Sequence, residues 1–222
     1  MKRLTLAALM LVFASGTSHA GCSSPYTPGV DWSGCFKERL MLSGRDSQGT
    51  NFSKAYLGGT SFSKGKLNGA NFSGAELMRV SFTGAMLAKS DFQRAYGSRI
   101  SFKKANLTGA NMHKAELQRS NFAGADLTGA SLLKADFFRS TFEGTNLTGV
   151  DLKRANLSRA SFAGANLKNA NLSEAYLYKA SFEGVGLSQT KGLAQEQIEK
   201  ICGDDKTQLP AGLSRPESWK CE

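Results

Sequence analysis

The sequence predicts an all-β solenoid, and three regularities in the residue pattern support this fold class. From Phe52 to Leu187, every fifth residue is apolar, with Gly97 as the single exception. A small residue, most often alanine, stands two positions before nearly all of these apolar residues. In two of the four series of residues spaced twenty apart, all the apolar residues are of one type, Phe in one series and Leu in the other. Because a period of five matches neither the 3.6 residues of an α-helical turn nor the two-residue period of a strand, neither an amphipathic helix nor an ordinary strand is expected here.

Short blocks of sequence identify the repeat. The blocks ANLTG, ADLTG, ANLSR and ANLKN fit the pattern A-[ND]-[LF]-x-x. They resemble the pentapeptide-repeat family, and the resemblance extends over about two thirds of the chain that follows residue 20. It implies a right-handed quadrilateral β-helix with four pentapeptides to a coil, so that residues twenty apart stack on one another.

The core residues support coils of twenty residues independently of that resemblance. One series contains only Phe and the next contains only Leu: Phe62, Phe82, Phe102, Phe122, Phe142, Phe162 and Phe182, then Leu67, Leu87, Leu107, Leu127, Leu147, Leu167 and Leu187. A bare five-residue motif would mix the two residue types along each series. Residues 50–189 are therefore expected to form about seven to eight coils, ~4.8 Å apart.

Gly97 leaves a hole in the core series between Leu77 and Leu117. Two structural explanations are available for it. The backbone could form a local bulge at this point, or the neighbouring Tyr96 could turn inward and fill the space that a larger residue would occupy.

The first twenty residues read as a secretory signal peptide. Lys2 and Arg3 precede a short apolar stretch, and Ser18 at position −3 and Ala20 at position −1 predict cleavage after Ala20. The apolar stretch is well short of the ~20 residues that a spanning helix needs, so no transmembrane segment is expected after cleavage. The predicted location is periplasmic or secreted. A lipoprotein anchored at Cys22 is the alternative.

Four cysteines flank the repeat region, two before it and two after it: Cys22, Cys35, Cys202 and Cys221. An even count in an exported chain favours two disulfides, and four cysteines allow three connectivities. Pairing within each end closes the shortest loops and needs no contact between the ends. A zinc site is the competing interpretation, but the spacings contain no C-x-x-C pair, so no metal is expected.

Both ends of the solenoid are expected to carry caps, because a bare terminal coil exposes apolar surface and unpaired backbone groups. Residues 21–49 are interpreted as an N-terminal cap with a degraded first coil, whose Trp32 covers the Phe52 column. Residues 190–222 are interpreted as a C-terminal cap. Its segment LAQEQIEKI predicts a short amphipathic helix with these apolar residues on one side: Leu193, Ile198 and Ile201.

The residues of catalytic and cofactor sites are scarce. After the leader, His113 is the only histidine, and the many hydroxyl and carboxyl side chains recur with the repeat. No glycine-rich loop precedes a helix in the manner of a phosphate-binding site. No catalytic residue and no cofactor are therefore assigned, and an enzyme is the least favoured class of function.

The formal net charge of the chain is +10. The arrangement of its basic residues says more about function than its few candidate catalytic residues do. Two outward positions recur as cations with a step of twenty residues. Column A consists of Arg79, Arg99, Arg119, Arg139, Arg159 and Lys179, and column B of Lys54, Arg94, Lys114, Lys134 and Arg154. The face between the columns carries a candidate aromatic platform: Tyr56, Tyr96, Phe138, Tyr176 and Tyr178.

Two interpretations of column A remain open. Glu76, Glu116 and Asp136 each stand three residues before an arginine of the column, so local ion pairs would turn it into a solvated, neutralised face. The other arginines lack such a neighbour, which leaves room for an anion-binding face instead. Adjacent cations at this spacing repel one another by about 0.9 kcal/mol even in bulk water, so some compensation is expected.

The leading hypothesis is a non-enzymatic, exported binding or scaffold protein of the bacterial envelope. The alternative is a polyanion- or glycan-binding module that uses the basic and aromatic face. The expected partner is an unknown protein or an anionic envelope polymer, and the oligomeric state is left open. Well-known members of the resembled family are acidic, cytoplasmic DNA mimics that protect topoisomerase. This chain is basic and carries a leader, so that role is not transferred to it.

Overall fold

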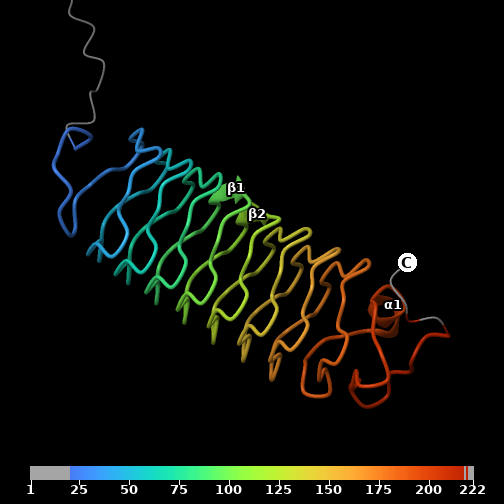
Figure 1. Cartoon of the computed structure of the whole chain (residues 1–222). Coiled ribbons are helices and arrows are strands. Elements are labelled where there is room, and N and C mark those ends of the chain that lie inside the picture. The colour runs from blue at the N-terminus through green and yellow to red at the C-terminus, as the bar shows by residue number, and fades with distance from the viewer. Residues whose placement is uncertain (1–20, 218, 220–222) are drawn as a thin grey trace, which may run out of the picture.

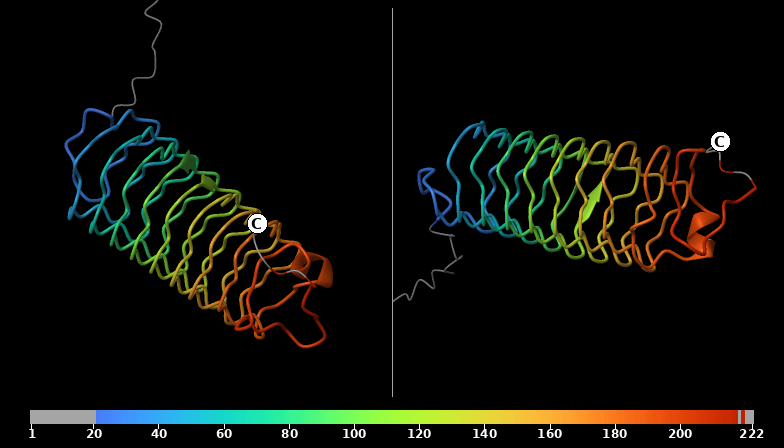
Figure 2. Two further views of the ribbon diagram at one scale, coloured as in Figure 1. Left: turned by 45° about the vertical axis from the view of Figure 1, so that its right-hand side comes forward. Right: turned by 90° about the horizontal axis from the view of Figure 1, so that it is seen from below.

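The computed structural model describes residues 21–217 and 219, which form an elongated rod of stacked coils (Figure 1). The colour runs steadily along the rod from its N-terminal to its C-terminal end, so coils that are neighbours in space are neighbours in sequence (Figure 2). The predicted signal peptide, residues 1–20, lies outside the described residues, as does Cys221.

Parallel bridges between residues twenty apart join each coil to the next. Asn51, for example, pairs with Asn71, which in turn pairs with Asp91. The longer elements are few: strand β1 (Tyr96–Ser98) pairs in parallel with strand β2 (Glu116–Gln118), and helix α1 covers Gln195–Ile198. The step of twenty residues, which lengthens only in the last two bridges, Ser181 with Cys202 and Gly186 with Gln208, agrees with four pentapeptides to a coil.

Each pentapeptide contains one tight turn. In a representative turn, the Ala75 N–H donates to the Phe72 carbonyl oxygen over 3.0 Å, and Gly74 at the second central position has a φ of +64°. A positive φ at this position is the mark of a type II turn. Because the coils stack in register, the turns stack as well, and the side chains at their second central positions form columns along the rod.

The interior contains the predicted stacks of like residues. The rings from Phe62 to Phe182 lie parallel, with centroids of successive rings 4.6–5.3 Å apart. Every Phe and Leu of the two predicted series is buried. Within these two columns each side chain therefore packs on a copy of its own type above and below, whereas the other two core columns mix Phe with Leu or Met.

Both explanations offered for Gly97 are wrong. The register is the same on either side of it, with Tyr96 opposite Glu116 and Ser98 opposite Gln118, so the strand has no bulge. Tyr96 points outward and is 43% exposed. The backbone itself closes the gap, because a Cβ placed on Gly97 would lie 2.8 Å from the carbonyl carbon of Leu77.

The N-terminal segment covers the first coil. Trp32 is buried against Phe52, with ring centroids 6.0 Å apart, as the sequence predicts. A disulfide joins Cys22 to Cys35, with their Cα atoms 5.4 Å apart. Lys37 occupies a core position of the degraded coil, where its ammonium donates to the Cys22 carbonyl oxygen over 2.8 Å and lies 3.9 Å from the Trp32 ring centroid.

Tyr26 completes this cap and makes its stability sensitive to alkaline pH. Its hydroxyl contacts the Ser47 hydroxyl, and burial, followed by the charge of Asp46, raises the pKa of Tyr26 to about 12 from 10.0. The neutral phenol is thus favoured in the folded state, so its contribution to stability is present below pH 10 and is lost as the pH rises through about 12.

We therefore expect Tyr26→Phe to unfold with a shallower loss of stability between pH 10 and about 12 than the parent protein. Urea denaturation at a series of pH values measures this difference, with the more exposed Tyr178→Phe as the control. Parallel curves for the parent protein and Tyr26→Phe would contradict the burial of the phenol against the cap.

The C-terminal segment folds back over the last coils and contains α1 within the segment predicted to be helical. Ile198 and Ile201 are buried, and the Gln197 amide donates to the Leu172 and Ala175 carbonyl oxygens over 3.0 and 2.9 Å. Cys202 is disulfide-bonded. Because Cys221 lies outside the described residues, the pairing of these two cysteines stays a prediction.

Candidate anion-binding face

The structure gives the two predicted basic columns a shared place in the fold. Their members all occupy the second central position of a turn, where they are exposed except for the half-buried Lys179. Arg94 of column B and Arg99 of column A, for instance, border the strand that carries Tyr96. The other two columns of turns are mostly glycine: Gly44, Gly84, Gly124, Gly144, Gly164 and Gly184 in one, and Gly29, Gly49, Gly69, Gly109, Gly129 and Gly149 in the other.

The backbone at the basic columns is strained. Every residue of columns A and B has a φ between 53° and 59°, in the left-handed region. An L-residue is disfavoured there by roughly 1–2 kcal/mol, whereas glycine adopts the region freely. Of the 17 described non-glycine residues with positive φ, 15 are Lys or Arg. The chain therefore keeps cations at turns where glycine would fold with less strain.

Of the two interpretations of column A, the one that relied on local ion pairs is wrong for its arginines. Within residues 21–217, no carboxylate oxygen lies within 4.0 Å of a side-chain nitrogen of its arginines, so Glu76, Glu116 and Asp136 form no such ion pair. Asp136 instead accepts hydrogen bonds from the Gln118 amide over 2.6 Å and from the Asn156 amide over 3.0 Å. Its carboxylate is used along the face, between coils, and not across the turn to Arg139.

Column B carries one ion pair at its C-terminal end. The Arg154 guanidinium donates to Glu174 over 2.6 Å, and Lys153 lies 3.4 Å from the same carboxylate. The hydrogen bond from Arg154 lowers the pKa of Glu174. Glu174 itself occupies the next turn of the column, so an acidic residue ends the run of cations there.

The aromatic residues of the face differ in accessibility. Tyr96, Tyr176 and Tyr178 are 43%, 66% and 52% exposed. Tyr56 is half-buried because Phe36 stacks on it, with ring centroids 4.3 Å apart. Phe138 is also half-buried, and the Arg139 guanidinium lies 5.2 Å from its ring centroid. The predicted platform is thus open at Tyr96 and at its C-terminal end.

Sequence reasoning missed two residues of this face in the first coil. Arg39 continues column A toward the N-terminus, since it has a φ of 55° and stands two coils before Arg79. Phe36, which is 76% exposed, extends the aromatic series. Steps of twenty residues backward from Arg79 and Tyr56 lead to both.

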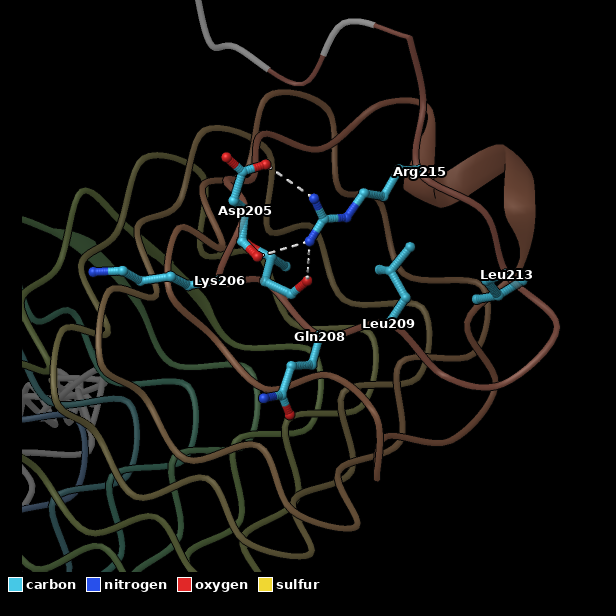
Figure 3. Close-up of a pocket in the computed structure, with 7 residues that line it drawn as sticks. Asp205, Lys206, Gln208, Leu209, Leu213 and Arg215 are labelled. Carbon is cyan, nitrogen blue, oxygen red and sulfur yellow. Dashed lines mark hydrogen bonds and ion pairs between the residues drawn. The ribbon is translucent and has the colours of Figure 1, made fainter.

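Cavities on the rod are shallow. One of about 590 Å³ lies in the C-terminal segment and is lined by Asp205, Gln208, Leu213 and Arg215 among others (Figure 3). Its arginine is already used, because Arg215 donates to the Asp205 carboxylate over 3.0 Å and to the Asp205 carbonyl oxygen over 2.8 Å. A second cavity, of about 290 Å³, lies between Tyr176, Tyr178 and Lys200.

The described residues contain neither a cluster of metal ligands nor a membrane-spanning helix. Among residues 21–217, no three His, Cys, Asp or Glu side chains gather as the ligands of a metal ion would. No helix in the described part of the chain has both the length and the apolar character needed to cross a membrane.

Comparison with known proteins gives the same repeat and the same fold. A family model of pentapeptide repeats (eight copies) matches residues 42–74, 75–113 and 87–122, and one of a pentapeptide repeat region matches 115–191. No curated protein matches the sequence.

Two solved structures resemble the rod at low sequence identity. The first is HetL from the cyanobacterium Nostoc sp. strain PCC 7120, a pentapeptide repeat protein involved in heterocyst differentiation regulation. It is 22% identical at a TM-score of 0.54, over 85% of this chain and 95% of HetL. A trypsin-treated variant of QnrB1, a plasmid-mediated fluoroquinolone resistance protein, is 19% identical at a TM-score of 0.54, over 78% and 86% of the chains. At this identity the likeness establishes the fold and not the role.

Proposed function

The chain belongs to the pentapeptide-repeat family, and we propose that it is an exported, non-enzymatic binding protein of the bacterial envelope whose basic face holds an anionic polymer. In this proposal residues 1–20 are a signal peptide, and residues 50–189 form a right-handed quadrilateral β-helix of about seven to eight coils. Residues 21–49 and 190–222 cap it. The binding face consists of columns A and B with the aromatic residues between them.

The observation that carries the proposal is the lack of ion pairs around the strained arginines of column A. Neither folding nor solubility requires arginine at these turns, since glycine relieves the strain and cations elsewhere on the rod maintain the net charge. Strained residues that persist in a fold are typical of functional sites. Arginines that form no ion pair keep their donors available for a ligand.

The spacing of the column favours a linear ligand over a compact one. The stacked core rings of successive coils have centroids 4.6–5.3 Å apart, and the arginines recur once per coil along the rod. A polymer with regularly placed carboxylate, sulfate or phosphate groups can follow that step. Arg forms paired, planar hydrogen bonds with such groups. The exposed rings of Tyr96, Tyr176 and Tyr178 offer flat surfaces on which sugar rings can lie.

A protein partner with an acidic stripe would match the same charges and is the competing occupant. Such a protein would have to place particular side chains against particular residues of the face, whereas a polysaccharide repeats one unit along it. Binding assays with purified acidic polysaccharides, in which no protein is present, separate the two occupants directly.

We expect Arg99→Glu and Arg119→Glu each to weaken binding to a linear acidic polysaccharide by about tenfold or more, because reversal removes one contact and adds one repulsion. Both variants should behave alike, since neither arginine forms an ion pair with the carboxylates expected to neutralise the column. Isothermal titration calorimetry at low salt measures the affinity.

The matched control is Lys104→Glu. Lys104 is an exposed cation with a φ of 56°, but it lies in a glycine-rich column away from the face. Its reversal changes the net charge by the same amount and should leave the affinity nearly unaltered. An equal loss in all three variants would show that only net charge matters and would overturn the assignment of the face.

A further inference from the structure

Two hollows on the basic columns are built in the same way, each at a glycine that lies between two cations of its column. In each, a glycine replaces the cation expected at a turn, while the turns of the coils before and after it keep their cations. Gly59 interrupts column A between Arg39 and Arg79, and a hollow of about 330 Å³ lies there. Gly74 interrupts column B between Lys54 and Arg94, with a hollow of about 220 Å³. The missing side chain leaves space that two cations border from opposite sides.

The hollow at Gly74 is lined only by cationic and neutral groups. Besides Gly74 its lining consists of Lys54, Ser73, Gln93 and Arg94. Within the described residues, none of these four side chains takes part in a hydrogen bond or ion pair, so their donors are available. The nearby Asp91 carboxylate is occupied, because its Oδ1 accepts from the Gln93 N–H over 2.9 Å and from the Asn111 amide over 3.0 Å.

The dimensions suit a small ligand. The rings of Phe52, Phe72 and Phe92, which lie in the same three coils, are stacked with centroids 4.9 Å apart at each step. Lys54 and Arg94 are thus two such steps apart and flank the glycine. A Cβ on Gly74 would already lie 3.5 Å from the Lys54 Cγ, so any longer side chain at this turn would enter the hollow.

The hollow at Gly59 also lies at a glycine between two cations, but its charges differ. Its lining includes Glu38 and Glu76 in addition to Arg39 and Arg79, so its cations and carboxylates balance. An anion placed there would meet two carboxylates. The comparison isolates what distinguishes Gly74: two cations, a hydroxyl and an amide without an acidic group in the lining.

We propose that the hollow at Gly74 is a seat for a single oxyanion, namely a sulfate or phosphate group carried by the ligand. Lys54 and Arg94 bind it from the two sides along the rod, with the guanidinium able to donate two hydrogen bonds at once. The Ser73 hydroxyl and the Gln93 amide, which also line the hollow, supply neutral donors. The inference builds on the proposed basic face, and it narrows the ligand from any polyanion to one that carries sulfate or phosphate esters.

The test replaces Gly74 with lysine, which raises the positive charge of column B while filling the seat. Lysine is tolerated at equivalent turns, as at Lys64 and Lys114 with φ values of 57°. Inorganic sulfate and inorganic phosphate serve as separate probes in NMR titrations, and a carboxylate-only polysaccharide serves as a third. The control is Gly59→Lys, which adds the same charge in the other hollow.

We expect saturable binding of one or both inorganic anions to the parent protein, at least fivefold weaker binding to Gly74→Lys, and unchanged binding to Gly59→Lys. The double variant Ser73→Ala with Gln93→Ala, which leaves the backbone untouched, should also bind these anions more weakly. The proposed oxyanion seat would be overturned if Gly74→Lys bound the anions as tightly as the parent protein or more tightly. It would also be overturned if the parent protein bound neither anion. If the seat is overturned but the parent protein still binds the carboxylate polysaccharide, the proposed basic binding face remains supported. If the parent protein does not bind this polysaccharide either, the proposed function fails as well.

Discussion

Phe122→Ala is expected to lower the free energy of unfolding by about 3–5 kcal/mol, as large truncations in rigid cores do. The Phe122 ring is fully buried, stacked 4.8 Å from Phe102 and 4.9 Å from Phe142, with its edge toward Phe137. The coils above and below cannot close over the cavity, because backbone hydrogen bonds such as Phe122 N–H to Thr141, 2.7 Å, fix their spacing.

Urea denaturation followed by circular dichroism measures this loss, and Phe138→Ala is the matched control. Phe138 is a half-buried Phe on the outer face of a neighbouring side, so its truncation should cost much less than that of Phe122. A loss under ~1 kcal/mol for Phe122→Ala would show that the Phe column is not packed as described.

Removing three central arginines of column A should lower the affinity of the protein for an acidic polysaccharide and raise its stability. We expect a variant with Arg99, Arg119 and Arg139 replaced by glycine to lose about a hundredfold or more in affinity for a linear acidic polysaccharide. The same variant should gain roughly 1–3 kcal/mol of stability, because three left-handed residues are relieved and their mutual repulsion disappears. The greater freedom of glycine in the unfolded chain limits this gain.

The control triple variant replaces Lys64, Lys89 and Lys104 with glycine. These lysines have φ values of 56–57° and lie in the glycine-rich columns, so the strain relieved and the charge removed are the same. The control should gain similar stability and keep its affinity. If the arginine variant loses stability while the control gains it, the arginines serve the fold and not a ligand.

The sequence predicts the placement of side chains on this rod unusually well, because every fifth residue points inward and every twentieth residue stacks. The Phe column and both basic columns follow from counting alone. Residues such as Arg99 and Arg119 could therefore be assigned to one corner without knowledge of any coordinate.

Features that depend on side-chain geometry could not be obtained by counting. Asp136 stands three residues before Arg139, but its carboxylate binds amides of the neighbouring coils, which the repeat also places within reach. The left-handed φ of the cations follows from the turn, and its sign in the sequence is the glycine that stands at the same position of many other pentapeptides. At Gly97 the residue pattern suggests a missing side chain, whereas the backbone has moved into that space.

The oxyanion seat illustrates the same limit. Gly59 and Gly74 look alike in the sequence, since each breaks a basic column once. Only the packing around each turn shows that carboxylates line one hollow and neutral donors line the other.

The affinity of the parent protein for a linear acidic polysaccharide, measured across a range of salt concentrations, tests the central claim most directly. Exposed charges are screened over a Debye length of ~8–10 Å at physiological ionic strength. We predict saturable binding at low salt that weakens steeply and continuously as salt is added, and no binding of a neutral polysaccharide of the same length. Absence of binding at low salt, or an affinity that does not change with salt, would contradict the account.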